Sequence, residues 1–269
     1  MRYAKVILCM AFILVLAAGC GVSEMEPGPK REKIAYREYT VKAPGEMKLL
    51  TQGDTGNVEV FAWDRNEFKI EASQRVRGVF AEERLKELVK DFRLDVKADN
   101  GAVYVKASYS GPVGNPLDRG TDLKIFTPRR RLLQMNVKWD AGRVKVYDDL
   151  DCSLQADLGL VDLDINRIKG RLEVQGDTGN ITVSGGVLEK GSFVRMNMGN
   201  IRIKGECEED GDYLFDTGVG NVDVWMPEDL RVCFESTGTV ETNEFQQEDA
   251  AAKVRVRSGM GRISIRKYE

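Results

Sequence analysis

Residues Gly176–Asn180 read GDTGN and lead into the stretch ITV, and the same pentapeptide occurs at Gly53–Asn57, where it leads into VEV. A third Asp-Thr-Gly triplet lies at Asp216–Gly218. After each full copy, aliphatic and polar residues alternate, which is typical of a strand with one buried face. The pentapeptide therefore predicts a tight turn that enters a strand, and its recurrence predicts a repeated β unit.

This unit recurs throughout the second half of the chain. From Gly142 onward, successive unit glycines lie 17, 20, 20, 21, 18 and 23 residues apart. In seven of eight units, the second and fourth residues after the glycine are aliphatic and the residue between them is polar. A period near 20 residues with this alternation predicts β units rather than helices. The units are GNVEV at 56, GRVKV at 142, GLVDL at 159, GNITV at 179, GNIRI at 199, GNVDV at 220, GTVET at 238 and GRISI at 261.

The repeat also predicts the fold class. A single unit cannot bury its own apolar face, whereas units stacked in parallel can share one interior. We therefore predict an all-β fold, a parallel β-solenoid (β-helix) with coils of about 20 residues. An up-and-down sandwich of hairpins is the alternative, and we disfavour it because the same residues recur at one point of each repeat.

Each turn residue has an expected role. Glycine supplies the positive φ of a corner, and the asparagine after it tolerates the left-handed region and can stack on its equivalents as an amide ladder. Asp and Thr before the glycine can bond nearby backbone N–H groups. The structural turn residues so assigned are Asp54, Gly56, Asn57, Asp177, Gly179, Asn180, Gly199, Asn200, Gly220 and Asn221.

The first half departs from the repeat. Residues 38–63 contain one β unit, and residues 64–120 read as a strand–helix–strand insertion or cap. Its helix is expected in Phe80–Phe92, where Leu85, Leu88 and Val89 share one face. Residues 121–269 then hold the solenoid repeats.

The N-terminus predicts export. Arg2 and Lys5 precede the apolar run Val6–Ala18, which is short for a permanent membrane span, so residues 1–19 are expected to be a lipoprotein signal peptide. Small residues lead to Cys20, the expected lipidation site, although Ala17 stands where a lipobox usually has Leu. Residues 20–37 then form a flexible tether. Ordinary secretion and an uncleaved anchor are the alternatives. The expected location is the cell envelope, attached to a bacterial membrane through lipid.

The order of these motifs resembles the putative-adhesin family of bacterial β-helical surface domains. The resemblance rests on GDTGNVEV followed by Trp63-Asp64, on QRVRG before a Glu-rich helix, on DLKIFTPR, and on the G-N-[IV]-x-[IV] units. It extends over about residues 36–265. The family name implies surface binding and supplies no catalytic residues.

Composition excludes much chemistry. The chain has no histidine, which removes the usual general base and zinc ligand, and we predict no metal and no cofactor. A net charge of −3 gives no reason to expect nucleic acid as a partner. Cys152, Cys207 and Cys233 remain after the signal, and buried thiols are favoured over a disulfide.

Three enzymatic or metal-binding interpretations are disfavoured. An aspartic peptidase needs two carboxylates about 3 Å apart, and the aspartates here are replaceable parts of the repeat. The acidic run Glu206–Asp212 lacks the spacing of a calcium loop, so a solvated turn is expected. A polysaccharide lyase or hydrolase would gather carboxylates or bases on one face, and the outward positions mix both signs.

We therefore predict a protein that is not an enzyme: a membrane-anchored surface lipoprotein with an adhesin-like binding or scaffold domain. Its partners would be the membrane, through the lipid, and a protein or glycan ligand on the β surface. The alternative is an envelope-stress or signalling accessory that binds a membrane protein, and a polysaccharide-acting enzyme is the remote one.

Overall fold

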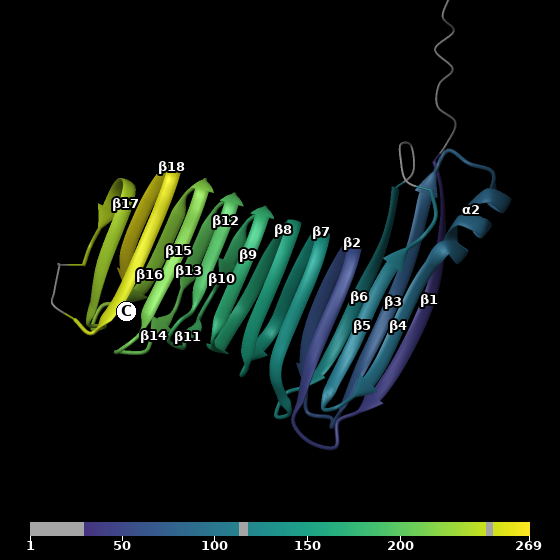
Figure 1. Cartoon of the computed structure of the whole chain (residues 1–269), viewed down its shortest axis with the longest axis horizontal. Coiled ribbons are helices and arrows are strands. Elements are labelled where there is room, and N and C mark those ends of the chain that lie inside the picture. The colour runs from purple at the N-terminus through teal and green to yellow at the C-terminus, as the bar shows by residue number, and fades with distance from the viewer. Residues whose placement is uncertain (1–29, 113–117, 246–249) are drawn as a thin grey trace, which may run out of the picture.

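The chain folds almost entirely into β-strands. The computed structural model describes residues 30–112, 118–245 and 250–269, and it is 75% strand. Within these ranges, one short α-helix and one 3-10 turn interrupt the strands. The strands lie side by side along the long axis of the molecule (Figure 1).

The N-terminal part contains six strands and the helix. Its elements are β1 (Arg31–Lys42), β2 (Met47–Trp63), β3 (Glu67–Gly78), α2 (Glu82–Leu88), η1 (Val89–Asp91), β4 (Phe92–Asp99), β5 (Ala102–Tyr109) and β6 (Asp118–Pro128). β1 begins inside the segment 20–37, which the sequence predicted as a tether.

The C-terminal part consists of strands alone within the described ranges. They are β7 (Leu132–Leu150), β8 (Ser153–Gly170), β9 (Leu172–Thr178), β10 (Ile181–Val183), β11 (Gly186–Leu188), β12 (Phe193–Met198), β13 (Ile201–Lys204), β14 (Glu206–Cys207), β15 (Asp212–Val219), β16 (Val222–Pro227), β17 (Val232–Asn243) and β18 (Ala252–Tyr268).

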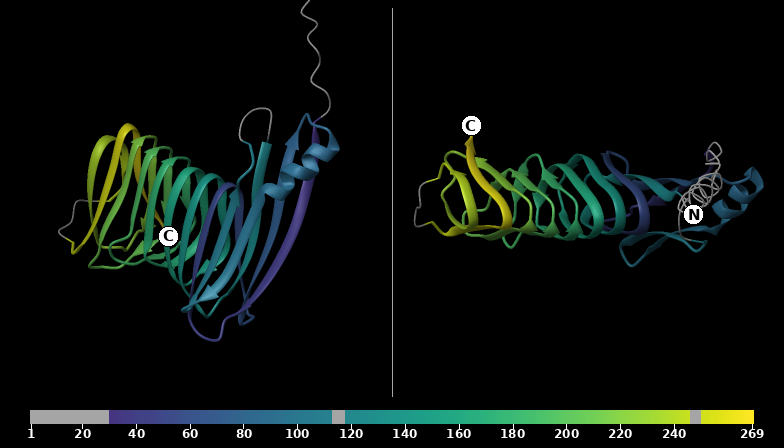
Figure 2. Two further views of the ribbon diagram at one scale, coloured as in Figure 1. Left: turned by 45° about the vertical axis from the view of Figure 1, so that its right-hand side comes forward. Right: turned by 90° about the horizontal axis from the view of Figure 1, so that it is seen from above.

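Two walls of strands enclose the core. The first wall has the order β4, β5, β2, β7, β8, β9, β12, β15, β18 and β17. The second wall has the order β1, β3, β6, β2, β7, β8, β10, β13, β16, β18 and β17. Three pairs at the N-terminal end are antiparallel, namely β4–β5, β1–β3 and β3–β6, whereas the other pairs in the walls are parallel. Figure 2 shows the walls facing each other across the interior.

The alternating pattern fills this interior. In β8, for example, Leu154, Ala156 and Leu158 are buried while the residues between them point outward. Trp139 is the largest fully buried side chain, and its Nε1–H donates to the carbonyl oxygen of Gly56 at 2.9 Å. A Cβ at Gly53 would overlap this indole ring, so the first glycine of GDTGN makes room for core packing.

The predicted parallel β-solenoid is wrong. The parallel strands form a closed β-barrel of 8 strands that carries extra strands. The prediction took each unit glycine for a corner between two strands, but β2 and β7 continue through Gly56 and Gly142, which bend one unbroken strand at φ values of +131° and +134°. Nor does spatial order follow chain order, because β18 lies between β16 and β17.

The N-terminal end has a small core of its own. Val76, Leu85, Leu88 and Phe92 form a second buried cluster between α2 and the strands. The segment 64–120 thus holds β3, α2, η1, β4 and β5, which extend both walls beyond β2.

Candidate functional site

The two GDTGN copies lie at bends of the sheet. Asp54 Oδ2 accepts a hydrogen bond from the backbone N–H of Tyr109 at 3.2 Å, which ties β2 to β5. The backbone N–H of Asn57 donates to Asp122 Oδ1 at 2.8 Å. In the second copy, Asp177 Oδ1 accepts from Asn197 Nδ2 at 2.8 Å. Both aspartates therefore bind groups of neighbouring strands.

Asparagines after the glycines form a row of hydrogen bonds from strand to strand. Asn200 donates through its backbone N–H and its Nδ2 to Asn180 Oδ1, at 3.2 and 3.0 Å. The backbone N–H of Asn221 donates to Asn200 Oδ1 at 2.9 Å, and Arg262 repeats this contact with Asn221 at 2.9 Å. Asn180 begins the row by donating to Asp162 Oδ1. Each side chain thus satisfies a backbone N–H at the next bend.

Glycine geometry explains why the bends repeat. Gly179, Gly199 and Gly220 have φ values of +146°, +137° and +146°. A Cβ at Gly199 would overlap the carbonyl oxygen of Gly179, and a Cβ at Gly220 would overlap that of Gly199. The positive φ values and the close carbonyl oxygens favour glycine at these positions. Asp54 and Asp177 are separated by β7 and β8, or about 14 Å, far from the contact distance of a carboxylate dyad.

The acidic run at Glu206–Asp212 is occupied by internal contacts. Glu208 Oε2 accepts from the backbone N–H of Lys190 at 3.0 Å, and Asp210 pairs with the Lys190 ammonium at 3.6 Å. Asp212 pairs with Arg255 at 3.6 Å. In the described residues, no group of three or more potential metal ligands is found.

Two of the three described thiols are buried. Cys152 and Cys207 are buried free thiols, and Cys233 is a half-buried one. Desolvation raises the pKa of Cys152 to about 12 and that of Cys207 to about 12, with a smaller contribution from the neighbouring carboxylates Asp151 and Glu206. Such thiols are poor nucleophiles at neutral pH.

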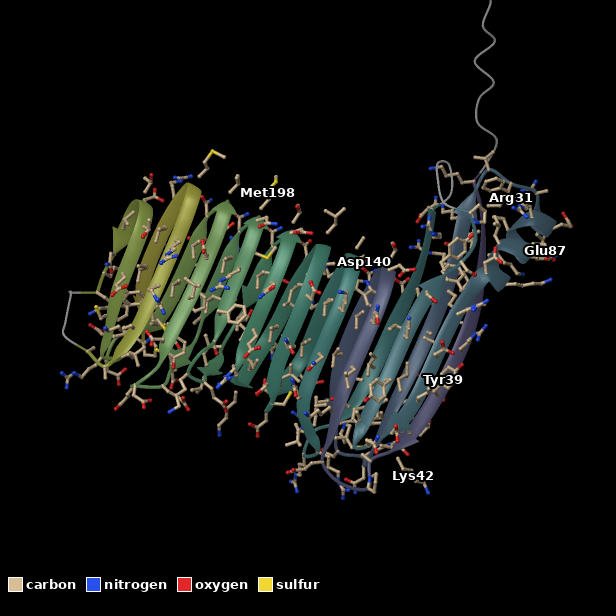
Figure 3. The ribbon with its side chains drawn as sticks, viewed as in Figure 1. Arg31, Tyr39, Lys42, Glu87, Asp140 and Met198 are labelled. Carbon is tan, nitrogen blue, oxygen red and sulfur yellow. The ribbon has the colours of Figure 1, made fainter. Side chains whose placement is uncertain are left out.

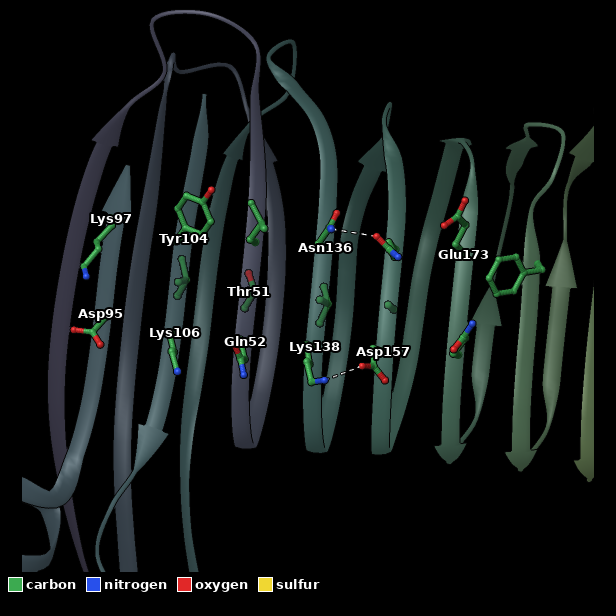
Figure 4. Close-up of a pocket in the computed structure, with 17 residues that line it drawn as sticks. Thr51, Gln52, Asp95, Lys97, Tyr104, Lys106, Asn136, Lys138, Asp157 and Glu173 are labelled. Atoms are coloured by element: carbon green, nitrogen blue, oxygen red, sulfur yellow. Dashed lines mark hydrogen bonds and ion pairs between the residues drawn. The ribbon is translucent and has the colours of Figure 1, made fainter. Parts of the chain in front are cut away.

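A hollow on the outer face of the first wall has a volume of about 740 Å³. We call it the outer groove (Figure 4). It crosses β4, β5, β2, β7, β8, β9 and the start of β12. The outward side chains along it are Leu50, Gln52, Asp95, Lys97, Tyr104, Lys106, Asn136, Lys138, Gln155, Asp157, Glu173, Gln175 and Phe193.

These side chains form two rows because the strands pair in register. The first row has the order Lys97, Tyr104, Leu50, Asn136, Gln155, Glu173 and Phe193. The second row has the order Asp95, Lys106, Gln52, Lys138, Asp157 and Gln175. It lies two residues further along each parallel strand and two residues earlier on the antiparallel strand β4. Five strand spacings, or about 24 Å, separate the first-row aromatic residues of β5 and β12.

Two contacts link neighbours in these rows. Asn136 Nδ2 donates to Gln155 Oε1 at 3.2 Å, and Lys138 Nζ donates to Asp157 Oδ2 at 3.0 Å. The hydrogen bond to Asp157 raises the pKa of Lys138, so this group stays an ammonium. The amides keep further donor and acceptor capacity toward the groove.

The outer groove contains two aromatic rings, one on β5 and one on β12. Tyr104 is 40% exposed, and Phe193 is half-buried with the Arg195 guanidinium carbon 5.2 Å from its ring centroid. The groove therefore offers two apolar surfaces with a polar, hydrogen-bonding floor between them.

Sequence reasoning missed the outer groove. Its residues come from seven segments, and no local motif links them. The sequence does show amide and aromatic residues among the charged ones at the outward positions of the strands. Only the strand register, however, shows that these residues lie next to one another on one surface.

Cys20 and the signal segment 1–19 lie outside the described residues. Among the helices that the structure describes, none has the length and apolar character needed to cross a membrane.

No protein-family model matches the chain, and no curated protein matches it. Solved structures with similar folds include a putative cell adhesion protein from Clostridium sporogenes, with 14% identity, coverage of 88% of this chain and 100% of that chain, and a TM-score of 0.36. A putative adhesin from Parabacteroides distasonis has 11% identity, coverage of 88% and 97%, and a TM-score of 0.43. A putative lipid binding protein from the same species has 11% identity, coverage of 88% and 97%, and a TM-score of 0.39. At these values, the likeness assigns neither a family nor a function.

Proposed function

We propose that the chain is a non-catalytic binding domain of the bacterial cell envelope, and that its outer groove binds an extended, neutral glycan. The observation that carries this proposal is the groove of about 740 Å³, with aromatic rings on β5 and β12 and amides between them. A groove that crosses seven strands suits a polymer better than a compact small molecule.

The charge of the groove favours a ligand without net charge. Its carboxylates are Asp95, Asp157 and Glu173, and its ammonium groups are Lys97, Lys106 and Lys138. Equal numbers of each sign leave no field that would select a polyanion or a polycation. Lys138 and Asp157 also neutralise each other directly.

The side-chain chemistry favours a sugar. Gln52, Asn136, Gln155 and Gln175 present amide donors and acceptors, which match the hydroxyl groups of a glycan. Tyr104 and Phe193 offer ring faces on which the apolar faces of sugar rings can pack. Both features can bind a glycan without catalysing a reaction on it.

Sequence features support display at a membrane. The signal-like segment 1–19 and the lipobox-like cysteine Cys20 precede the first described strand. Lipid on Cys20 would hold the domain at the membrane surface and leave the outer groove available.

The test is a glycan array, followed by titration of the best ligand against the detergent-solubilised full chain. Tyr104→Ala should weaken binding about tenfold, or ~1.4 kcal/mol, because the groove loses one of its two aromatic rings. Tyr36→Ala is the matched control, since Tyr36 is 75% exposed on β1 and lies off the outer groove.

An empty array would contradict the proposal, as would equal affinities for the wild-type chain and Tyr104→Ala. Capture of one membrane protein in a pull-down whose yield falls with Tyr104→Ala would instead assign the groove to a protein partner.

A further inference from the structure

The bends of the sheet carry a row of exposed apolar side chains that the proposed function does not use. Leu160, Met198, Val219 and Met260 are 64%, 52%, 37% and 67% exposed. Large apolar residues of a β-fold are normally on the buried face, so four of them at equivalent positions require an explanation.

Strand register makes these residues one continuous surface. Leu160 pairs with Thr178, Thr178 with Met198, Met198 with Val219, and Val219 with Met260. In the other direction, Leu160 pairs with Ala141. We call the row Ala141, Leu160, Thr178, Met198, Val219 and Met260 the apolar edge. None of its members carries a charge, and it crosses five strand spacings, or about 24 Å.

Charges of both signs lie around the apolar edge, and none lies on it. The residues directly before and after each member are glycines, Val161, Asn197 and the two aspartates Asp140 and Asp177. Arg143 and Arg262 lie two residues beyond the edge and pair with acidic groups of the second wall, Asp162 and Glu241. The edge itself carries no charge, and the flanking charges of both signs give it no excess of basic residues that would select an anionic surface.

The N-terminal segment indicates what covers the apolar edge. Arg31, Asp140 and Met198 lie at the same edge of the molecule, whereas Lys42 lies at the opposite edge (Figure 3). The described chain therefore begins on the side that carries the apolar edge, directly after the segment with the apolar run Val6–Ala18 and Cys20. Ten residues lie between Cys20 and Arg31, and the eleven Cα-to-Cα steps from one to the other can span at most about 40 Å.

We propose that the apolar edge contacts a neutral lipid surface. This inference rests on the lipid anchor of the proposed function, because the anchor holds the Arg31 side of the domain toward the membrane. Leu160, Met198, Val219 and Met260 enter the interfacial region, as the apolar face of an amphipathic element does. The domain is then held with its strands directed away from the membrane and the outer groove facing sideways.

The experiment uses the full lipidated chain in phosphatidylcholine vesicles, with and without doxyl-labelled phosphatidylcholine. An NBD fluorophore is attached at Met198→Cys in a Cys233→Ser background, because Cys152 and Cys207 are buried. Lys42→Cys, at the opposite edge, is the matched control. Flotation of the vesicles reports anchoring separately.

The expected result is a blue shift of the NBD emission at Met198 and quenching by the doxyl lipid, with neither effect at Lys42. Adding Leu160→Glu and Met260→Glu should restore the aqueous spectrum at Met198 without loss of flotation. Flotation with equal, unquenched emission at both sites would overturn the inferred lipid contact of the apolar edge and leave the lipid anchor in place. A blue shift without doxyl quenching would mean that protein covers the edge, and would overturn the inference as well. A chain that does not float would overturn both the anchor and the inference.

Discussion

The parallel part from β7 to β16 and the N-terminal end from β1 to β6 use different means to hold their strands together. In the parallel part, equivalent residues pair at a near-constant offset, as Ile181 does with Ile201 and Ile201 with Val222. Glycine bends and an asparagine row recur at each step. At the N-terminal end the pairing turns antiparallel and a helix covers a separate small core. The difference indicates that backbone geometry limits substitution in the first region, whereas side-chain packing does so in the second.

The largest expected effect is at a bend glycine. Gly199→Ala should lower the free energy of unfolding by about 4 kcal/mol or more, because the new Cβ meets the carbonyl oxygen of Gly179 at a positive φ. Chemical denaturation of the two proteins measures this. Gly101→Ala is the comparison at the N-terminal end, where φ is +73° but the nearest atom lies 3.9 Å from the Cβ, so about 1 kcal/mol is expected. Equal losses at the two glycines would remove the distinction between the regions.

The next effect is in the small core. Leu85→Ala should cost about 2–3 kcal/mol, because Leu85 is fully buried between α2 and the strands. Hydrogen exchange should show faster opening of β3 and β4 with unchanged protection of β12 and β15. Uniform loss of protection along the chain would show that the two regions open as one unit.

A smaller effect is expected in the asparagine row. Asn200→Ala removes the acceptor for the backbone N–H of Asn221, and should cost about 1 kcal/mol. Asn166→Ala, which removes only an exposed contact with Asp149, serves as the control and should leave the midpoint of denaturation unchanged. The row has no architectural role if both variants match the wild type.

The smallest effect at neutral pH concerns the thiols. Desolvation raises the pKa of Cys152 and Cys207 above that of unfolded cysteine, about 8.5, so their contribution to stability is complete below that pH. It is lost as the pH rises from about 8.5 toward 12, because only the unfolded chain ionises readily there. Unfolding free energies of the wild type and of Cys152→Ala should therefore converge as the pH rises. A constant difference between them across this range would contradict the burial of the thiol.

The sequence predicted the all-β composition, because the alternation in β8 and its neighbours is regular. The predicted β-solenoid is wrong, because the local sequence pattern does not distinguish a glycine that ends a strand from a glycine that bends a continuous strand. The helix expected in Phe80–Phe92 is seen over Glu82–Leu88, after which η1 leads into β4.

The outer groove and the apolar edge could not be predicted. Tyr104 and Phe193 are 89 residues apart, and only the register of five intervening strand pairs places them on one surface. The exposure of Met198 and Met260 could not be predicted either. Each methionine precedes a glycine with positive φ, and the sequence indicates the role of that glycine but not whether the methionine side chain is exposed.

The most direct test of the outer groove is the dissociation constant of the array's best glycan, measured for oligomers of increasing length with wild type, Tyr104→Ala and Phe193→Ala. We predict that affinity rises with length until the ligand spans the roughly 24 Å between the two rings. Phe193→Ala should then weaken the binding of only those oligomers that are long enough to reach both rings. Affinity that does not depend on length, with both variants binding as the wild type does, would contradict the account.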